Sequence, residues 1–216
     1  MAFPTQPVID TCTRADENPL AFGGRWLNGI SSLKIASNRL RADTGEGLAG
    51  WVNIAASPDV EAYIRMDTAP TNAGEQFYFF ARMTSAASIS SGYAVRFDKD
   101  ANRVAVLRID SGALTTLAAD FAPTGDGGGF GFSITGNVLQ RYYYDGAWHA
   151  LDAVTDGTYP NAGYFSMYTN NNSGRYSQIG AGPVSSVLGG GGSVSATGGI
   201  HEPLLGRGIG RGFGWR

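Results

Sequence analysis

Short segments in which apolar and polar residues alternate are the feature that most constrains the fold of this chain. In 60–66, valine, alanine, isoleucine and methionine occupy every second position, with a glutamate, a tyrosine and an arginine between them. The segments 77–83 and 93–97 repeat the pattern. A period of two is expected of strands that pack one face inward and turn the other to solvent. Because helical periodicity is nearly absent, the sequence predicts an all-β protein.

Turn residues separate these segments at short intervals. A tight hairpin requires positive φ, which small residues and residues that tolerate the left-handed backbone conformation can adopt. Three pairs of this kind are Ser111-Gly112, Gly136-Asn137 and Asp145-Gly146. The predicted strands are 33–36, 39–42, 51–54, 60–66, 77–83, 93–97, 103–110, 113–117, 130–135, 138–144, 147–154, 163–168 and 176–179. Strands 104–154 are expected to form a meander. The regular spacing, in a chain with 32 glycines, predicts a two-sheet antiparallel jelly-roll sandwich.

The composition changes at residue 189. Residues 189–192 are consecutive glycines, and the last 28 residues hold 11 glycines and no strand pattern. Such a segment buries too little apolar surface to offset its backbone entropy, so alone it is expected to be flexible. The sequence therefore predicts a β-sandwich domain over 1–188 and an extended Gly/Arg-rich C-terminal arm over 189–216.

Charge, hydropathy and cysteine content exclude several classes of protein. The formal net charge is −2, whereas a nucleic-acid-binding protein is usually basic. The longest purely apolar stretch, 77–81, is far shorter than the roughly 20 residues that span a bilayer. The single cysteine, Cys12, excludes an intramolecular disulfide and a thiolate-based structural zinc site. Residues 1–14 lack the segments of a secretory signal peptide, so we expect cytosolic synthesis and no membrane partner.

An opening motif and several later segments carry a resemblance to a known family. Residues 10–20, Asp-Thr-Cys-Thr-Arg-Ala-Asp-Glu-Asn-Pro-Leu, are followed by two glycines and Trp26. This run resembles the start of concanavalin A-like sandwich domains of bacteriophage structural proteins, which often begin Asp-Thr-Phe-Thr-Arg; Cys12 stands here in the aromatic position. Later matching segments are 92–96, 107–110, 114–117 and 159–164, so the resemblance covers about residues 8–186. It implies a sandwich of a kind that hosts lectins, glycanases and structural modules.

The sequence offers no complete catalytic constellation. Glucanases of this architecture place acidic residues at alternate positions of one strand, but Asp59 and Glu61 are followed at the next same-face position by Tyr63. We therefore interpret the two carboxylates as solvent-facing charges. The two histidines, His149 and His201, lie in contexts that do not indicate a serine triad. The chain is expected not to be an enzyme.

Asp98, Asp100 and Asn102 have the spacing that opens a calcium-binding loop. Calcium prefers several such hard oxygen ligands. The pattern is incomplete, because Arg103 and a strand follow in place of the glycine and the distant glutamate of an EF-hand. A charged hairpin turn is the favoured interpretation, and calcium is the only cofactor that the sequence suggests.

Four aromatic residues gather in one predicted hairpin. Tyr142 and Tyr144 share a strand face opposite Tyr143, and Trp148 follows across the Asp145-Gly146 turn. Exposed aromatic rings can stack on sugars or on a neighbouring subunit, whereas ordinary cross-strand packing is the simpler explanation. Tyr142, Tyr144 and Trp148 are accordingly the candidate carbohydrate-binding residues.

The arm carries apolar and cationic residues between its glycines. With three arginines and one glutamate its charge is +2, which leaves about −4 on the sandwich. Arginine, tryptophan and phenylalanine are typical anchors at protein interfaces. The candidate docking residues are Leu204, Leu205, Arg207, Ile209, Arg211, Phe213, Trp215 and Arg216. A disordered linker and weak nucleic-acid binding are the alternatives.

Two functional hypotheses follow. The leading one, from the resemblance, is a non-enzymatic bacteriophage virion protein. It would be a capsid decoration or head or tail surface protein that displays a lectin-like sandwich on the virion surface and docks by its arm onto other virion proteins. Symmetric repetition on a particle would make it a homo-oligomer, such as a trimer. The alternative is a carbohydrate-binding tail or fibre adhesin that contacts host surface glycans.

Overall fold

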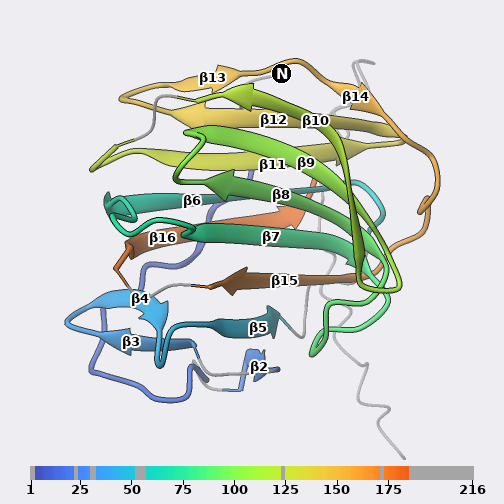
Figure 1. Ribbon diagram of the computed structural model, residues 1–216. Coiled ribbons are helices and arrows are strands. Elements are labelled where there is room, and N and C mark those ends of the chain that lie inside the picture. The colour runs from blue at the N-terminus through green and yellow to red at the C-terminus, as the bar shows by residue number, and fades with distance from the viewer. Residues whose placement is uncertain are drawn as a thin grey trace, which may run out of the picture. The chain divides into compact units, whose positions relative to one another are not determined.

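Two antiparallel β-sheets packed face to face make up the sandwich (Figure 1). The computed structural model describes residues 3–21, 24–29, 33–51, 57–122, 125–170 and 173–184. The C-terminal arm lies outside the described residues, as does most of the predicted strand 51–54. No helix in the described part of the chain is long and apolar enough to cross a membrane.

Each sheet combines strands from distant parts of the sequence. The nine-stranded sheet has the order β13 (Trp148–Ala150), β12 (Val138–Tyr144), β11 (Gly129–Thr135), β6 (Val60–Thr68), β16 (Arg175–Pro183), β4 (Arg39–Ala42) and β3 (Leu33–Ala36), with β1 (Val8–Asp10) paired to β16 and β14 (Val154–Thr155) to β12. The seven-stranded sheet has the order β10 (Ala113–Phe121), β9 (Arg103–Asp110), β8 (Gly92–Asp98), β7 (Gln76–Met83), β15 (Tyr164–Thr169), β5 (Gly47–Trp51) and β2 (Trp26–Asn28). The predicted all-β, two-sheet antiparallel sandwich is confirmed.

Most predicted strands and all three hairpin turns occur where the sequence places them. Ser111 and Gly112, between β9 and β10, have φ of 52° and 87°. Two predictions need correction. The predicted strand 147–154 is divided into β13 and β14. The meander is wrong beyond β10, because the chain then crosses to the other sheet to form β11.

The main core lies between the two sheets and is rich in aromatic rings. The ring of Phe130 on β11 lies 5.7 Å from Phe77, 5.5 Å from Phe79 and 5.7 Å from Phe97, all on the opposite sheet. These rings are almost completely buried. Aromatic pairs at such separations stabilise a core beyond the effect of area burial alone. The inner faces of β7 and β8 are therefore fixed against β11.

A buried arginine also joins the two sheets. Arg141 on β12 is 1% exposed and forms an ion pair with Asp120 on β10. Its guanidinium donates to the carbonyl of Asp152, at 2.7 Å and 3.2 Å, and to that of Val104 at 3.1 Å. A buried charge is tolerated only when it is paired and hydrogen-bonded in this way.

The strands are more completely buried than simple alternation predicts. Alternation predicts that Glu61 and Tyr63 on β6 face solvent, yet they are only 2% and 5% exposed. The segment 3–7 lies over them, as Glu61 and Tyr63 both hydrogen-bond to it. A second apolar cluster covers the outer face of the seven-stranded sheet. Both sheets thus carry packed side chains on both faces.

Asp156, which follows β14, is the centre of a hydrogen-bonded cluster. Its carboxylate accepts hydrogen bonds from the Tyr93 hydroxyl (2.7 Å), the Thr158 backbone N–H (2.8 Å) and the Arg108 guanidinium (3.0 Å). Partial burial disfavours the charged carboxylate, but bonds from Thr158, Tyr93 and Arg108 outweigh it and lower the pKa of Asp156 to about 2. Ionised Asp156 therefore stabilises the fold.

Asp156→Asn is expected to lower the free energy of unfolding at pH 7 by about 1 kcal/mol, because the amide accepts these bonds without a charge. Since the pKa of Asp156 lies below that of an unfolded aspartate, its contribution is complete above about pH 4 and is lost as the pH falls toward 2. Urea unfolding of both proteins from pH 7 to pH 2 should show the two free energies converging. A difference that persists undiminished at pH 2 would contradict this.

Candidate functional site

The structure brings the three predicted sugar-contacting residues together on the outer face of the nine-stranded sheet. Tyr144 on β12 pairs with Trp148 on β13, and their rings lie 5.2 Å apart. Tyr142 lies two residues before Tyr144 and points to the same face. Tyr143 points the other way and packs against the main core. The hairpin therefore presents an aromatic cluster on this side of the molecule.

Other side chains of the chain cover these rings. Phe3 stacks on Tyr142 with the ring centres 3.7 Å apart and the planes within 3°, and its centre lies 4.9 Å from that of Trp148. The guanidinium of Arg65 lies 3.5 Å from the centre of the Tyr144 ring. The ring faces on which a sugar would stack are thus already covered by Phe3 and Arg65. The assignment of carbohydrate binding to these three residues stays a prediction.

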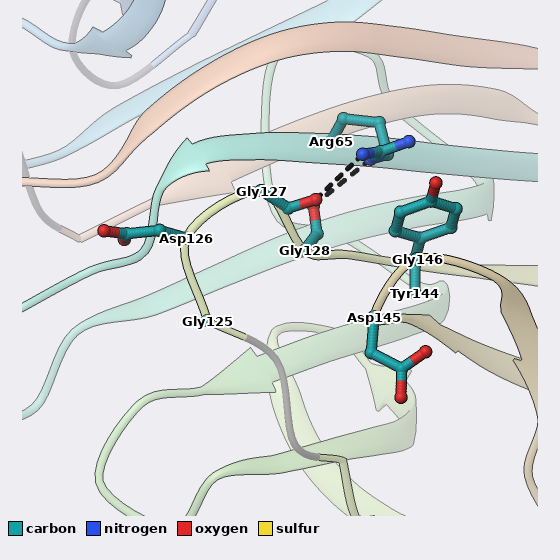
Figure 2. Close-up of a pocket in the computed structure, with 8 residues that line it drawn as sticks. All are labelled: Arg65, Gly125, Asp126, Gly127, Gly128, Tyr144, Asp145 and Gly146. Atoms are coloured by element: carbon teal, nitrogen blue, oxygen red, sulfur yellow. Dashed lines mark hydrogen bonds between the residues drawn. The ribbon is translucent and has the colours of Figure 1, made fainter.

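A hollow of about 350 Å³ opens beside Tyr144, between the turn at Asp145 and the loop 125–128 (Figure 2). Arg65 donates to the carbonyls of Gly127 at 2.8 Å and Gly128 at 3.4 Å, so it holds the loop in place. Figure 2 shows the carboxylates of Asp126 and Asp145 directed away from Arg65. Both have partners, the backbone N–H of Ala69 for Asp126 and His149 for Asp145. The charged side chains around this hollow thus have partners within the protein.

The two acidic residues considered for catalysis have structural contacts. The Glu61 carboxylate accepts hydrogen bonds from the backbone N–H groups of Thr5 (2.5 Å) and Gln6 (2.6 Å) and from the Thr5 hydroxyl (2.9 Å). Asp59 accepts a bond from the backbone N–H of Gly136 at 2.8 Å. The interpretation of Glu61 as a solvent-facing charge is wrong, because the segment 3–7 covers it.

The candidate calcium residues have partners of other kinds. Asp98 accepts hydrogen bonds from the Gln76 side chain at 3.0 Å and the Ala101 backbone at 3.2 Å, and Asp100 accepts one from the backbone of Gly74 at 2.8 Å. Asn102 lies in the β8–β9 turn, with φ of 45°. Among the described residues, no three His, Cys, Asp or Glu side chains form a group that could hold a metal ion. The candidate docking residues 204–216 and His201 lie outside the described part of the chain.

A groove that the sequence did not reveal lies on the outer face of the seven-stranded sheet. It has a volume of about 190 Å³ and is lined by Tyr78, Phe80, Ile89, Leu114 and Tyr168. Tyr78 on β7 pairs with Tyr168 on β15, so the two tyrosines lie side by side in the sheet. Leu114 on β10 forms the exposed edge, with 47% of its surface accessible. The groove therefore has an aromatic side and an aliphatic side.

The loop 84–91 forms one wall of the groove and supplies Ile89. It packs closely on the sheet at two glycines. A β-carbon on Gly50 would lie 2.2 Å from the Ala86 carbonyl oxygen, and one on Gly29 would lie 2.6 Å from that of Ala87. Such approaches are too short for any side chain, so glycine at these positions lets the loop lie against the sheet.

Hydrogen-bonded polar groups extend from both tyrosines. The Tyr78 hydroxyl donates to the Gln76 side chain at 2.6 Å, and Gln76 donates in turn to Asp98 at 3.0 Å. The Tyr168 hydroxyl donates to Glu46 at 2.9 Å. Burial and the contact with Glu46 raise the pKa of Tyr168 to about 12, so it remains a neutral donor at physiological pH. Aromatic rings and planar polar groups thus adjoin one another along this face.

Two groups on this face lack hydrogen bonds to any described residue. The Nε of Arg96, which pairs with Tyr78 across β7 and β8, is buried without a partner. The hydroxyl of Ser166 on β15 is also buried without one. Buried polar groups are usually hydrogen-bonded, so these two are exceptions, but neither residue is among those that line the groove. The sequence contains one signal of a second packed face. It is the run 77–80, in which Tyr78 and Phe80 alternate with Phe77 and Phe79, so that both faces of the strand carry aromatic rings.

No protein-family model and no curated protein sequence matches this chain. Solved structures match its fold. A carbohydrate-binding module, CBM66 from Bacillus subtilis, has a TM-score of 0.58 and 14% identity over 73% of this chain and 95% of the module. The exoplasmic domain of VIP36, in its Ca2+/Man-bound form, has a TM-score of 0.58 and 14% identity over 74% and 84% of the two chains.

An enzyme shares the fold as well. The GH43 protein BlXynB from Bacillus licheniformis has a TM-score of 0.59 and 17% identity over 81% of this chain and 39% of the enzyme. At these identities the comparisons establish a lectin-like, concanavalin A-like sandwich and no particular activity. A functional assignment must therefore rest on the surfaces described above.

Glu61→Gln is expected to reduce the free energy of unfolding by about 1–2 kcal/mol, because the amide weakens three hydrogen bonds to a buried carboxylate. Amide hydrogen exchange at Thr5 and Gln6 should accelerate at the same time. Asp145→Asn, at an exposed carboxylate near the same sheet, is the control and should change stability by less than about 0.5 kcal/mol. Unchanged exchange at Thr5 and Gln6 in the Glu61 variant would show that Glu61 does not hold the segment 3–7.

Proposed function

We propose that this protein binds carbohydrate, and that the groove on the outer face of the seven-stranded sheet is its binding site. The observation that carries the proposal is a hollow of about 190 Å³ that is lined by the paired Tyr78 and Tyr168 together with Ile89 and Leu114. Ligand sites combine apolar and aromatic walls with a few polar groups that fix orientation. Sugars suit this surface, since their C–H faces pack on aromatic rings and their hydroxyls bond to planar side chains.

The fold relatives support the same class of ligand. One is a carbohydrate-binding module, and another is a domain solved in a Ca2+/Man-bound form. Fold alone does not determine function, so their contribution is to favour a sugar over other ligands that an aromatic groove could hold.

The proposal is for binding without cleavage. Asp59 and Glu61 are near neighbours in sequence, but Glu61 is covered and accepts three hydrogen bonds from the segment 3–7. A catalytic pair of carboxylates must instead face the sugar from either side of the scissile bond. Glu61 also lies on the nine-stranded sheet, away from the groove residues of β7 and β15.

Tyr168→Ala is expected to weaken binding to the recognised glycan at least tenfold on a glycan array, because it removes one aromatic wall of the groove. The matched control is Tyr164→Ala, which removes a tyrosine from the same strand, 39% exposed and outside the groove, and should leave binding unchanged. Tyr144→Ala tests the hairpin cluster in parallel. Loss of binding in the Tyr144 variant alone would overturn the groove assignment in favour of the hairpin.

A second proposal concerns where binding takes place. We propose display on a bacteriophage particle, as the sequence resemblance implies, with the arm as the anchor to capsid or tail proteins and the sandwich presented to host surface glycans. The observation that favours an anchor is the series of apolar and arginine residues between glycines in 204–216. Repetition on the particle would make the protein a homo-oligomer.

Co-sedimentation with particles that lack this protein tests the anchor. The full-length chain should sediment with them, whereas a chain ending at Leu188 should remain in the supernatant, because it lacks the arm. Both proteins should bind glycan equally, which serves as the folding control. Equal sedimentation of the two would mean that the sandwich itself makes the particle contact.

A further inference from the structure

A row of three polar side chains crosses the outer face of the nine-stranded sheet. Glu61 on β6 pairs with Ser133 on β11, and Ser133 pairs with Gln140 on β12. Directly opposed residues of neighbouring strands share a face, so all three side chains point outward. A polar pocket of about 200 Å³ opens over this row, and Thr5 and Thr135 also line it. Hydroxyl, amide and carboxylate groups thus meet in one hollow.

The segment 3–7 forms one wall of the polar pocket, and the sheet is shaped to receive it. Phe3, which lines the pocket, lies over Gly131, where a β-carbon would come within 2.7 Å of the Phe3 ring. A β-carbon on Gly182 would likewise collide with the side chain of Gln6. Glycine at both positions lets the segment lie against the sheet. The wall that it contributes is therefore well defined.

Several polar groups that line the pocket have little to bond to within the protein. The hydroxyls of Ser133 and Tyr142 lie 3.4 Å apart, longer than the roughly 2.5–3.0 Å of a hydrogen bond between hydroxyls. The hydroxyl of Thr135 has no hydrogen bond to a described residue. The amide nitrogen of Gln140 donates to two backbone carbonyls, which leaves its Oε1 as an acceptor. These groups line an open pocket, so a ligand can reach them.

The charge around the polar pocket favours a neutral ligand. Among the described residues that line it, Glu61 alone is charged. Its carboxylate accepts three hydrogen bonds from Thr5 and Gln6, which leaves about one of its four acceptor positions free. The negative charge repels an anion, and the three bound donors already offset it, so a cation gains little. A neutral hydroxyl can still donate to the remaining position.

We propose that the polar pocket is a second ligand site, which binds one neutral sugar unit against the docked segment 3–7. At about 200 Å³ the pocket is smaller than the roughly 300–1,000 Å³ of pockets for drug-sized ligands, so it suits a single ring. The sugar hydroxyls donate to Gln140 and Glu61 and accept from the hydroxyls of β11. The site lies on the opposite sheet from the groove and does not depend on the function proposed for the groove.

Hydrogen exchange at Thr5 and Gln6 reports on this site, because the segment 3–7 must release the ligand before it opens. The full-length protein is titrated with glucose, galactose, mannose and N-acetylglucosamine, and with glucosamine and glucuronate as cationic and anionic probes. A neutral sugar at about ten times its Kd should slow exchange at both amides about tenfold, since opening is reduced by the factor 1 + [L]/Kd. The charged probes should have no comparable effect at the same concentration.

Substitutions assign the binding to the polar pocket, with affinity measured by isothermal titration. The double variant Ser133→Ala with Thr135→Val removes two hydroxyls and should weaken binding about tenfold. Its control is Thr115→Val, at an exposed threonine on the other sheet, which should bind as the wild type does. Phe3→Ala removes part of the wall and should abolish binding, whereas Phe121→Ala, at a phenylalanine that is 64% exposed, should not. Thermal unfolding of each variant checks that the fold is intact.

The outcomes separate this inference from the function proposed for the groove. Protection of Thr5 and Gln6 that persists in Tyr168→Ala supports a separate site, even if the groove binds no glycan. Protection that Tyr168→Ala removes would place the ligand in the groove and overturn the inference. The inference also fails if no neutral sugar slows exchange, if glucosamine or glucuronate does so instead, or if Phe3→Ala binds as tightly as the wild type.

Discussion

The alternation of side chains along β7 and β8 is the constraint on which both the core and the groove depend. Phe77, Phe79 and Phe97 point inward and pack against Phe130, which fixes the register of β7 and β8. The residues between them, such as Tyr78, must then point outward. A slip of one residue would exchange the two sets. The composition of the outer groove is therefore set by packing in the core, without any separate scaffold.

The two aromatic surfaces of this protein are both contacted by its own side chains. On the nine-stranded sheet, Phe3 stacks on Tyr142 and Arg65 lies over Tyr144, while Arg65 also binds the neighbouring loop. On the seven-stranded sheet, Tyr78 stacks on Phe80 and is only 6% exposed, whereas the neighbouring Tyr168 is half-buried and Leu114 is 47% exposed. An aromatic ring contributes to ligand binding only if a face or an edge remains free. The free surface of the groove therefore lies on Tyr168 and Leu114.

The sequence predicts local structure well and predicts burial poorly, for a physical reason. Turns such as Ser111-Gly112 depend on a few adjacent residues, so composition identifies them. The burial of Glu61 depends on Thr5 and Gln6, more than 50 residues away, and alternation alone made it appear exposed. The groove wall at Ile89 comes from a loop of small polar residues with no distinctive pattern. Which distant segment covers which face is a property of tertiary packing, which a strand pattern does not contain.

The glycines beneath the loop 84–91 connect the fold to the groove. Gly50 and Gly29 allow the carbonyl groups of Ala86 and Ala87 to approach the sheet backbone, which brings Ile89 to the edge of the hollow. A loop held this closely has little freedom to adjust, so the shape of the groove is largely preorganised before any ligand arrives.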